Sequence, residues 1–408
     1  TGLTDSHIVL GSLSGVEEQL VELTLNVNGI SDLSPLSGMV NLNVLSIWEN
    51  DVSDVSSLQN LVHLTYLNIG YNKISTITPL ERLVELQYLY LYYNEISDIS
   101  PLINLTNLTF LNLGYNQISS ITPLYNMKKL ISLEVYNNAV SDISPLSEIE
   151  DLVTLQLQNN NISDISHLNR MKKLTYLHLA ANEISSINSL SEMSDLKYLY
   201  LNNNNITNIT VFEGKSDLIS LYLYENNISD ISSLSGLVNL EELRLQYNNI
   251  SNISPLSKML DLVELYLYIN NISDISALFK MENLIDLRLQ GNNFSDISSL
   301  SNMTKLKYLD LGSNEISSIM SLSNLKDLTN LSIYDNNISD ISPLAGMYGL
   351  TDLYLHYNNI SDISFLSSMN DLSILNLSNN PLSTTMSSSL TTLSSLPSLT
   401  TLTLDSVG

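Results

Sequence analysis

The sequence lacks the cysteine and histidine patterns on which many catalytic and metal sites depend. It contains five histidines and no cysteine, which excludes a cysteine–zinc site, an iron–sulfur cluster, a disulfide scaffold and a thiol nucleophile. The motifs H-E-x-x-H and G-x-S-x-G and the phosphate-binding loop do not occur. The histidines are His7, His63, His167, His178 and His356, and they are widely separated along the chain. We therefore expect a protein that is not an enzyme and that has no cofactor and no metal site.

The charge of the chain narrows the range of partners. Its 408 residues include 16 Lys and Arg against 42 Asp and Glu, which gives a net charge of −26. No stretch is basic, so we expect no nucleic-acid partner, because neutralising phosphates requires clustered Lys and Arg. The longest apolar runs, such as Tyr88 to Tyr93, are far too short for a membrane span.

The elements that must position any functional residue follow from a strict internal repeat. The pattern Leu-x-x-Leu-x-Leu-x-x-Asn-x-Ile begins at Leu20 and returns every 22 residues until Leu372, which gives seventeen repeat starts without an insertion or a deletion. The first part predicts a short strand whose leucines point inward. The Asn at the ninth position, from Asn28 to Asn380, can satisfy backbone groups where the chain turns. Prolines such as Pro101 predict a 3₁₀ turn after it.

This unit is identified as a leucine-rich repeat. The segment I-S-D-I-S-P-L, as at Ile96 to Leu102, resembles the internalin type of bacterial leucine-rich-repeat proteins. It is also similar to the phosphatase-regulatory repeat family, which shares the 22-residue unit. The resemblance implies an α/β solenoid with a curved parallel β-sheet on the concave face and short 3₁₀ turns on the convex face. It further implies a non-enzymatic protein, extracellular or at the cell surface, that binds a partner through the concave sheet.

The repeat divides the chain into three parts. We expect a degenerate N-terminal repeat or cap over residues 1–19, the solenoid over 20–382, and a longer last connection with a terminal strand over 383–408. One repeat departs from the consensus, because Lys215 occupies the position where Met or Leu is expected. That loss of an apolar residue predicts a local kink or a looser joint.

The tyrosines have an uneven distribution that predicts a binding face. There are 22 Tyr against 5 Phe and 1 Trp, and twenty of the Tyr occupy the third, fifth, seventh and eighth positions of the repeat, here called the four inner columns. Packing along a sheet face is one explanation, since aromatic residues favour strands. A binding face explains better why Tyr is preferred to Phe, because Tyr adds a hydrogen-bonding tip to a rigid ring. The flanking charges are mostly acidic, which favours a neutral or basic partner, either protein or carbohydrate.

The residues predicted to bind the partner are Trp48, Tyr66, Tyr71, Tyr88, Tyr90, Tyr92, Tyr93, Phe110, Tyr115, Tyr136, Tyr176, Tyr198, Tyr200, Tyr222, Tyr224, Tyr247, Tyr266 and Tyr268. Tyr308, Tyr334, Tyr354 and Tyr357 also lie in the inner columns.

Two further patterns recur along the repeat. Acceptor motifs for N-glycosylation share the tenth position, at Asn161, Asn205, Asn227, Asn249, Asn271, Asn293, Asn337 and Asn359, and would line one flank with glycans in a glycosylating secretory route. Asp recurs at the thirteenth position of ten units, as at Asp32 and Asp98. These aspartates could form a ladder for cations or cap the corners of the repeat, and we favour capping because other polar residues replace them elsewhere.

An alternative function is structural. The segment Leu399-x-x-Leu402-x-Leu404 predicts a final strand with no Lys or Pro to protect its edge. Leu399, Leu402 and Leu404 of one molecule could extend the sheet of the next near Leu20, Leu23 and Leu25. Such a head-to-tail contact does not close, so it would give a filament, a homo-polymer through the solenoid ends.

Overall fold

The computed structural model describes residue 15 and residues 19–382 and 386–407. The chain forms two compact units, Thr1–Asn205 and Ile206–Gly408. Most of the predicted N-terminal cap, together with His7 and residues 383–385 of the last connection, lies outside the described residues.

In the first unit, three-residue strands alternate with three-residue 3₁₀ turns. The strands are β1 (Glu22–Thr24), β2 (Val44–Ser46), β3 (Tyr66–Asn68), β4 (Tyr88–Tyr90), β5 (Phe110–Asn112), β6 (Ser132–Glu134), β7 (Thr154–Gln156), β8 (Tyr176–His178) and β9 (Tyr198–Tyr200). The turns are η1 (Ser34–Leu36), η2 (Ser56–Leu58), η3 (Thr78–Leu80), η4 (Ser100–Leu102), η5 (Thr122–Leu124), η6 (Ser144–Leu146), η7 (Ser166–Leu168) and η8 (Asn188–Leu190). Each strand pairs in parallel with the next at an offset of one repeat, so that Leu89 lies opposite Leu111.

The second unit continues the same alternation. The strands are β10 (Ser220–Tyr222), β11 (Glu242–Arg244), β12 (Glu264–Tyr266), β13 (Asp286–Arg288), β14 (Tyr308–Asp310), β15 (Asn330–Ser332), β16 (Asp352–Tyr354), β17 (Ile374–Asn376) and β18 (Thr401–Thr403). The helical elements are η9 (Thr210–Phe212), η10 (Ser232–Gly236), η11 (Ser254–Lys258), η12 (Ser276–Leu278), η13 (Ser298–Leu300), η14 (Met320–Leu322), η15 (Ser342–Leu344), η16 (Ser364–Ser368) and α2 (Met386–Ser394). The longer last connection contains α2, and β18 still pairs in parallel with β17 through Leu375 and Leu402.

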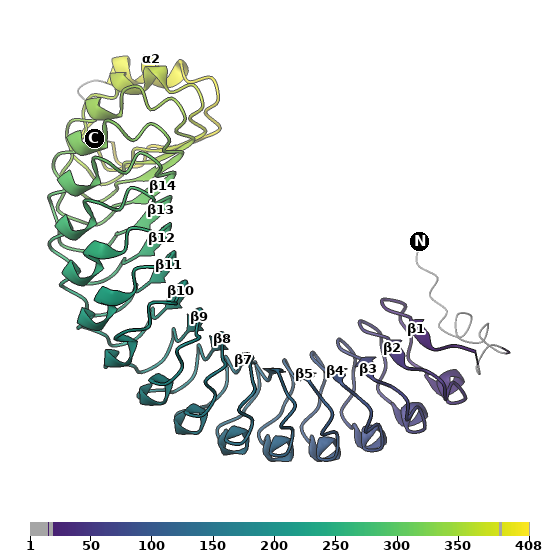
Figure 1. The fold of residues 1–408 in the computed structure, drawn as a ribbon. Coiled ribbons are helices and arrows are strands. Elements are labelled where there is room, and N and C mark those ends of the chain that lie inside the picture. The colour runs from purple at the N-terminus through teal and green to yellow at the C-terminus, as the bar shows by residue number, and fades with distance from the viewer. Residues whose placement is uncertain (1–14, 16–18, 383–385, 408) are drawn as a thin grey trace. The chain divides into compact units, whose positions relative to one another are not determined.

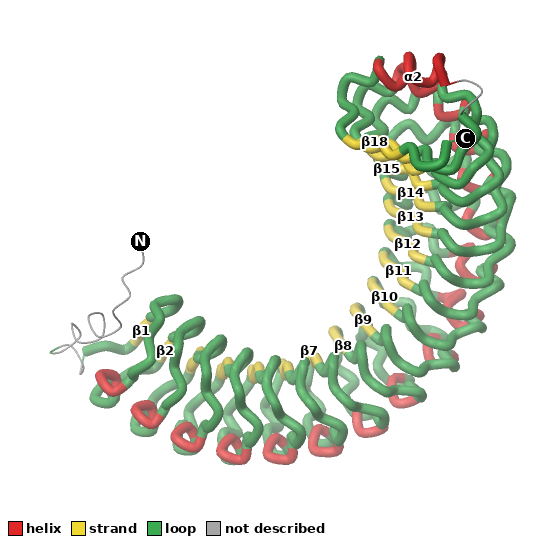
Figure 2. Tube along the Cα trace, turned by 180° about the vertical axis from the view of Figure 1, so that it is seen from behind, coloured by secondary structure: helices red, strands yellow, loops and turns green. Residues whose placement is uncertain are grey.

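The predicted solenoid of parallel strands and short 3₁₀ turns is confirmed within each unit. Figures 1 and 2 show the strands on the inner side of each stack of repeats and the 3₁₀ turns on the outer side. Between the two sides lies a core of regularly spaced apolar residues. In the fourth repeat Leu86, Leu89, Leu91 and Ile96 are all fully buried. Burying one such side chain contributes about 1.5–3 kcal/mol, so the core repeats this gain several times in each unit of 22 residues.

The predicted asparagine ladder is confirmed. The side-chain amide of Asn94 donates to the carbonyl oxygens of Leu91 and of Ile69 in the preceding repeat, both at 3.0 Å. Its oxygen accepts the backbone N–H of Ile74, also at 3.0 Å. One side chain thus satisfies buried backbone groups in two adjacent repeats, which explains why the ninth position is always Asn.

The recurrent aspartates have a local structural role. In each of the ten units the carboxylate accepts the backbone N–H two residues later at 2.8 or 2.9 Å, as from Ser100 to Asp98, and so opens the 3₁₀ turn. Asn208 and Asn252 cap Thr210 and Ser254 in the same way. These contacts support corner capping as the role of the thirteenth position.

These caps predict that acid weakens the fold. Hydrogen bonds from the backbone N–H and then the hydroxyl of the following Ser lower the pKa of Asp98, Asp230 and Asp274 below the ordinary 3.8. The stability they contribute is therefore present above that ordinary value and is lost as the pH falls through the lowered values. A variant with all three changed to Asn keeps the hydrogen-bond acceptor without a proton to gain. We expect its acid-unfolding midpoint, followed by circular dichroism, at a lower pH than that of the wild type; an equal or higher midpoint would contradict the assignment.

In the irregular ninth repeat, the side chain of Lys215 is buried. Lys215 is only 6 % exposed, although it replaces an apolar residue. The Met at the same position of the second unit, Met259, is fully buried. The lysine therefore occupies core space and does not turn outward, while the predicted looser joint at this repeat stays a prediction.

Candidate binding face

The aromatic residues predicted to bind a partner lie on the inner side of the units, on the strands and just after them. Strand geometry causes this, because successive side chains point to opposite faces. Tyr88 and Tyr90 flank the buried Leu89 and face outward. Tyr88 is 44 % exposed, whereas Tyr90 and Trp48 are half-buried. The inner columns thus form a surface of partly covered rings.

Nine rings of the first unit form one connected group, here called the first aromatic cluster. Neighbouring centroids in it are 3.9 to 6.5 Å apart. Its members are Tyr66, Tyr71, Tyr88, Tyr90, Tyr92, Tyr93, Phe110, Tyr115 and Tyr136. Ring contacts of this kind add about 0.5–1.5 kcal/mol each beyond area burial, so they hold the aromatic surface in place before any partner arrives.

The eighth column has a backbone conformation that tyrosine does not favour. All its residues, from Val27 to Asn379, have φ between 50° and 67°. This left-handed region costs most residues roughly 1–2 kcal/mol and suits Gly and Asn, which occur at several of these positions. Five of the column's residues are nevertheless Tyr: Tyr71, Tyr93, Tyr115, Tyr247 and Tyr357. Backbone preference therefore does not explain these tyrosines.

Three of these tyrosines form a stack. The ring of Tyr93 lies 4.1 Å from that of Tyr71 and 3.9 Å from that of Tyr115, with interplanar angles of 14° and 15°. A hydrogen bond with the Tyr115 hydroxyl is the main cause of the raised pKa of Tyr93. The two faces of the middle ring are thus occupied by its neighbours, and a ligand meets mainly ring edges and hydroxyl groups.

Part of the seventh column has a packing role. A Cβ placed on Gly70 would lie 2.5 Å from the ring of Tyr92 in the next repeat. Gly114 receives the ring of Tyr136 in the same way. Tyr92 and Tyr136 therefore fill space left by a missing side chain, so sheet-face packing accounts for some of the tyrosine excess.

A smaller group lies at the end of the first unit. The ring centroid of Tyr176 lies 6.1 Å from that of Tyr198 and 5.4 Å from that of Tyr200, and the ring of His178 lies 4.9 Å from that of Tyr200. Burial lowers the pKa of His178 to about 4, so its ring is neutral at physiological pH. His178 acts here as part of the aromatic surface.

The second unit has a different chemistry, a ladder in which tyrosine and arginine alternate along the fifth column. The guanidinium of Arg244 lies 4.4 Å from the ring centroid of Tyr222 and 4.7 Å from that of Tyr266. The guanidinium of Arg288 lies 4.6 Å from the ring centroid of Tyr266. These are cation–π contacts. Tyr266 is consequently only 8 % exposed and offers a partner the least surface of the predicted tyrosines.

Carboxylates of the third column brace this ladder. Glu242 accepts the Tyr222 hydroxyl at 2.7 Å, and Glu264 pairs with Arg244 at 2.9 Å. Asp286 accepts the Tyr266 hydroxyl at 2.8 Å and holds Arg288 through both of its oxygens, at 3.0 and 3.1 Å. Two of the few basic residues on the acidic face are therefore fixed by internal pairs.

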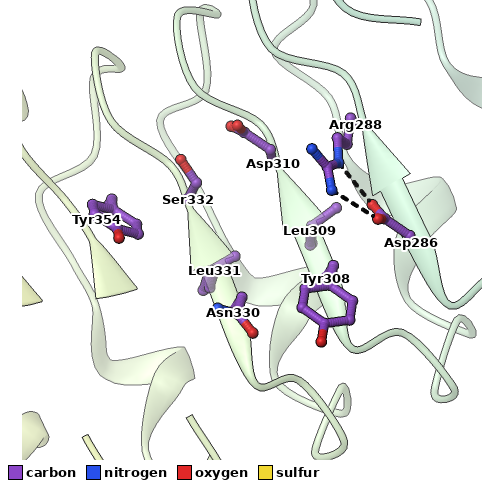
Figure 3. Close-up of a pocket in the computed structure, with 9 residues that line it drawn as sticks. All are labelled: Asp286, Arg288, Tyr308, Leu309, Asp310, Asn330, Leu331, Ser332 and Tyr354. Atoms are coloured by element: carbon purple, nitrogen blue, oxygen red, sulfur yellow. Dashed lines mark hydrogen bonds and ion pairs between the residues drawn. The ribbon is translucent and has the colours of Figure 1, made fainter. Parts of the chain in front are cut away.

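Beyond Arg288 the face is hollowed into a depression of about 210 Å³ over β13 to β16. Figure 3 shows Tyr308 and Asp310 on β14, the short side chains of Asn330 and Ser332 on β15, and Tyr354 on β16. Small residues on the middle strand leave this space between two tyrosines. The sequence analysis did not predict this depression. The available signal was the short Ser332 next to Tyr354 in the fifth column, with Tyr308 in the third.

The predicted glycosylation acceptors and the predicted self-assembly ends differ in how exposed they are. All eight Asn of the tenth column are exposed, so the glycosylation flank stays a prediction with accessible acceptors. At the ends, Leu23 and Leu402 belong to β1 and β18, and Leu402 is 40 % exposed where Leu375 of β17 is fully buried; Leu20, Leu25, Leu399 and Leu404 flank these strands. Self-assembly through them stays a prediction.

The two histidines of the inner columns belong to different units. The ring of His356 stacks on that of Tyr334 with centroids 4.7 Å apart and belongs to the second unit, whereas His178 belongs to the first.

Two features are absent from the described part of the chain. No group of three or more His, Cys, Asp or Glu is placed to hold a metal ion among residues 15, 19–382 and 386–407. Over the same residues, no helix has the length and apolar character required to cross a membrane.

Sequence comparison places the chain in a family. The profile of leucine-rich repeats in two copies matches residues 40–82, 84–126, 172–214, 216–258, 238–280, 282–326, 304–346 and 326–368, and the single leucine-rich-repeat profile matches residues 371–393. These matches span more than half of the sequence, so this protein belongs to the leucine-rich-repeat family. No curated protein matches the sequence.

Solved structures similar to this chain narrow the type. An internalin from Listeria monocytogenes is 28 % identical, with 90 % of this chain and 92 % of that chain covered and a TM-score of 0.53. Together with the 22-residue unit, this similarity supports an internalin-like protein. A leucine-rich-repeat protein of Leptospira interrogans (21 % identity, coverage 98 % and 99 %, TM-score 0.77) shares the fold. So does the Arabidopsis receptor kinase HAESA, solved with a peptide hormone and a co-receptor (19 % identity, coverage 93 % and 80 %, TM-score 0.69).

Proposed function

We propose that this chain is a non-enzymatic recognition module, extracellular or at the cell surface, that binds a protein partner through its tyrosine-rich inner face. The single observation that carries the proposal is the first aromatic cluster, in which nine rings hold one another in place while Tyr71, Tyr88 and Tyr115 stay 40–44 % exposed. Rigid aromatic surface loses little conformational entropy on binding, which is why such residues dominate interfaces. Three of the cluster's tyrosines also occupy backbone positions better suited to Asn.

A protein partner fits this surface better than a carbohydrate. Sugar rings stack on open aromatic faces, whereas both faces of Tyr93 are covered by Tyr71 and Tyr115. Edges and hydroxyl groups suit the mixed polar and apolar surface of a protein. The plant receptor that shares the fold was solved with a peptide and a protein on it, which is consistent with this choice.

The proposal is tested by changing Tyr71, Tyr93 and Tyr115 together to Asn. Asn suits the left-handed backbone, so we expect a melting temperature equal to or above that of the wild type. Loss of the stack should weaken binding at least about tenfold, or roughly 1.4 kcal/mol, as expected for central aromatic residues. The measurement is surface plasmon resonance with partners found by screening the wild-type chain against an array of purified extracellular protein domains.

The matched control changes Tyr125 and Tyr348 to Asn. These two tyrosines are 46 % and 62 % exposed but lie outside the four inner columns. We expect the control variant to bind as the wild type does. Equal binding by the triple variant, or no partner for the wild type, would refute the proposal, and capture of glycans alone would assign the face to carbohydrate.

A further inference from the structure

Two tyrosines of the inner face differ from the rest because their rings contact no other aromatic ring in the described part of the chain. Eighteen of the twenty inner-column tyrosines contact another aromatic ring. Among the described residues, Tyr308 and Tyr354 have no such contact. Both line the depression over β13 to β16. The two inner-column tyrosines without a ring partner thus line the same hollow.

The depression also contains a carboxylate that forms no close ion pair among the described residues. Asp310 accepts the backbone N–H of Gly312 at 3.0 Å, and no Lys, Arg or His of the described residues pairs with it within 4.0 Å. The neighbouring Arg288 is held by Asp286. Burial raises the pKa of Asp310, and hydrogen bonds from Gly312 and Ser332 together with the attraction of Arg288 offset this only in part. A desolvated carboxylate of this kind gains from an added cation.

The chain itself shows which group fits between two such tyrosines. Arg244 lies between Tyr222 and Tyr266 in the fifth column and pairs with Glu264. At the depression, Ser332 takes the corresponding place in the fifth column, and its side chain is too short to fill it. Its neighbours in that column are Asp310 and Tyr354, while Tyr308 lies in the third column on the strand of Asp310. The depression therefore offers a carboxylate and a tyrosine beside Ser332 in its column and a second tyrosine in the third column, and no basic side chain projects from the position of Ser332.

We propose that the depression between β13 and β16 receives an arginine side chain of the protein partner, with Tyr308 and Tyr354 on its two sides and Asp310 as its counter-charge. The proposal rests on the proposed protein-binding function and names the residue type that the face selects. A net charge of −26 favours basic segments over acidic ones during encounter. Lysine shares the charge of arginine but lacks the planar fork, so it is expected to bind more weakly.

The test uses a library of random dodecapeptides displayed on phage and the full chain immobilised as the target. We expect enriched peptides to share an arginine. Synthetic forms of the best peptide, with that arginine kept or changed to lysine or to glutamine, are then titrated by isothermal calorimetry. Asp310→Asn should weaken the arginine peptide at least about tenfold, because a buried charge pair loses one partner.

Two further variants make the result specific. Ser332→Arg places a guanidinium in the depression from inside, so it should abolish peptide binding while the melting temperature stays equal or rises. Asp335→Asn removes the same charge from an exposed position at φ 50°, where Asn fits, and should change affinity less than about twofold. A folded Ser332→Arg chain with full binding would overturn the proposal.

The outcomes separate this inference from the function on which it rests. Peptides that bind wild type and Asp310→Asn equally but lose affinity in the Tyr71, Tyr93 and Tyr115 variant would overturn the arginine site and support the binding face. Peptides enriched without a basic residue would also overturn the arginine site. A library that yields no peptide above the blank surface would count against both.

Discussion

Replacing Asn248 with alanine is expected to lower the free energy of unfolding by about 2–4 kcal/mol, because several buried backbone groups lose their partner at once. The amide of Asn248 donates to the carbonyls of Leu223 and Leu245, both at 3.0 Å. Its oxygen accepts the backbone N–H of Ile228 at 2.9 Å. Alanine supplies none of these groups, and the side chain is only 8 % exposed, so water cannot easily replace it.

The neighbouring residue provides the control. Asn249 is exposed, and its part in the fold is the backbone N–H that it donates to Ile228, which alanine also has. Asn249→Ala should therefore change stability by less than about 0.5 kcal/mol. Urea unfolding followed by circular dichroism measures both variants. Equal loss in the two would show that the ninth position has no special role.

The second large effect is expected at the twentieth position of the repeat. Lys215→Met should raise the free energy of unfolding by about 1–3 kcal/mol, since replacing a buried charged group with an apolar residue of similar volume is often stabilising. Lys215 is 6 % exposed, and Met already occupies this position elsewhere in the second unit. The reverse change, Met259→Lys, should lower the free energy of unfolding by more than about 3 kcal/mol, because it inserts a charge at a fully buried site.

The control for this pair is Lys258→Met, at an exposed lysine next to Met259. It changes the net charge as Lys215→Met does, so it separates the effect of burial from the effect of charge. We expect a change below about 0.5 kcal/mol. Thermal and urea unfolding of the four proteins give the measurement. A destabilised Lys215→Met variant would mean that the interactions of the lysine outweigh its burial.

The regular part of the fold could be predicted because each position of the repeat has one physical task. Leu89 must point inward from a strand, and Asn94 must satisfy backbone groups at a turn, so both residue types recur without exception. Pro101 marks the start of η4 for the same reason, since proline fixes the backbone of a first turn. In contrast, α2 was not predicted, because its Ser- and Thr-rich sequence has no strong helical period.

The sequence predicted where the tyrosines lie on the inner face, but it did not predict which residues they contact there. The column positions of Tyr90 and Tyr222 follow from strand alternation, yet their partners do not: Tyr90 packs on Phe110, whereas Tyr222 packs on Arg244. The left-handed conformation of the eighth column was missed, although Gly and Asn at several of its positions were a usable signal. Tyr308 and Tyr354 were counted in their columns and not recognised as the rings left open.

The sequence by itself determined the repeat, the strand and turn positions, the buried core and the face on which tyrosines gather, because these depend on local period and on burial. Only the tertiary structure decided which aromatic rings pack against a neighbouring ring and which do not, because this packing depends on the side chains in the adjacent repeats. Ser332 illustrates the difference. In sequence it is an ordinary outward-facing residue, but between Asp310 and Tyr354, with Tyr308 nearby in the third column, its small size contributes to the hollow.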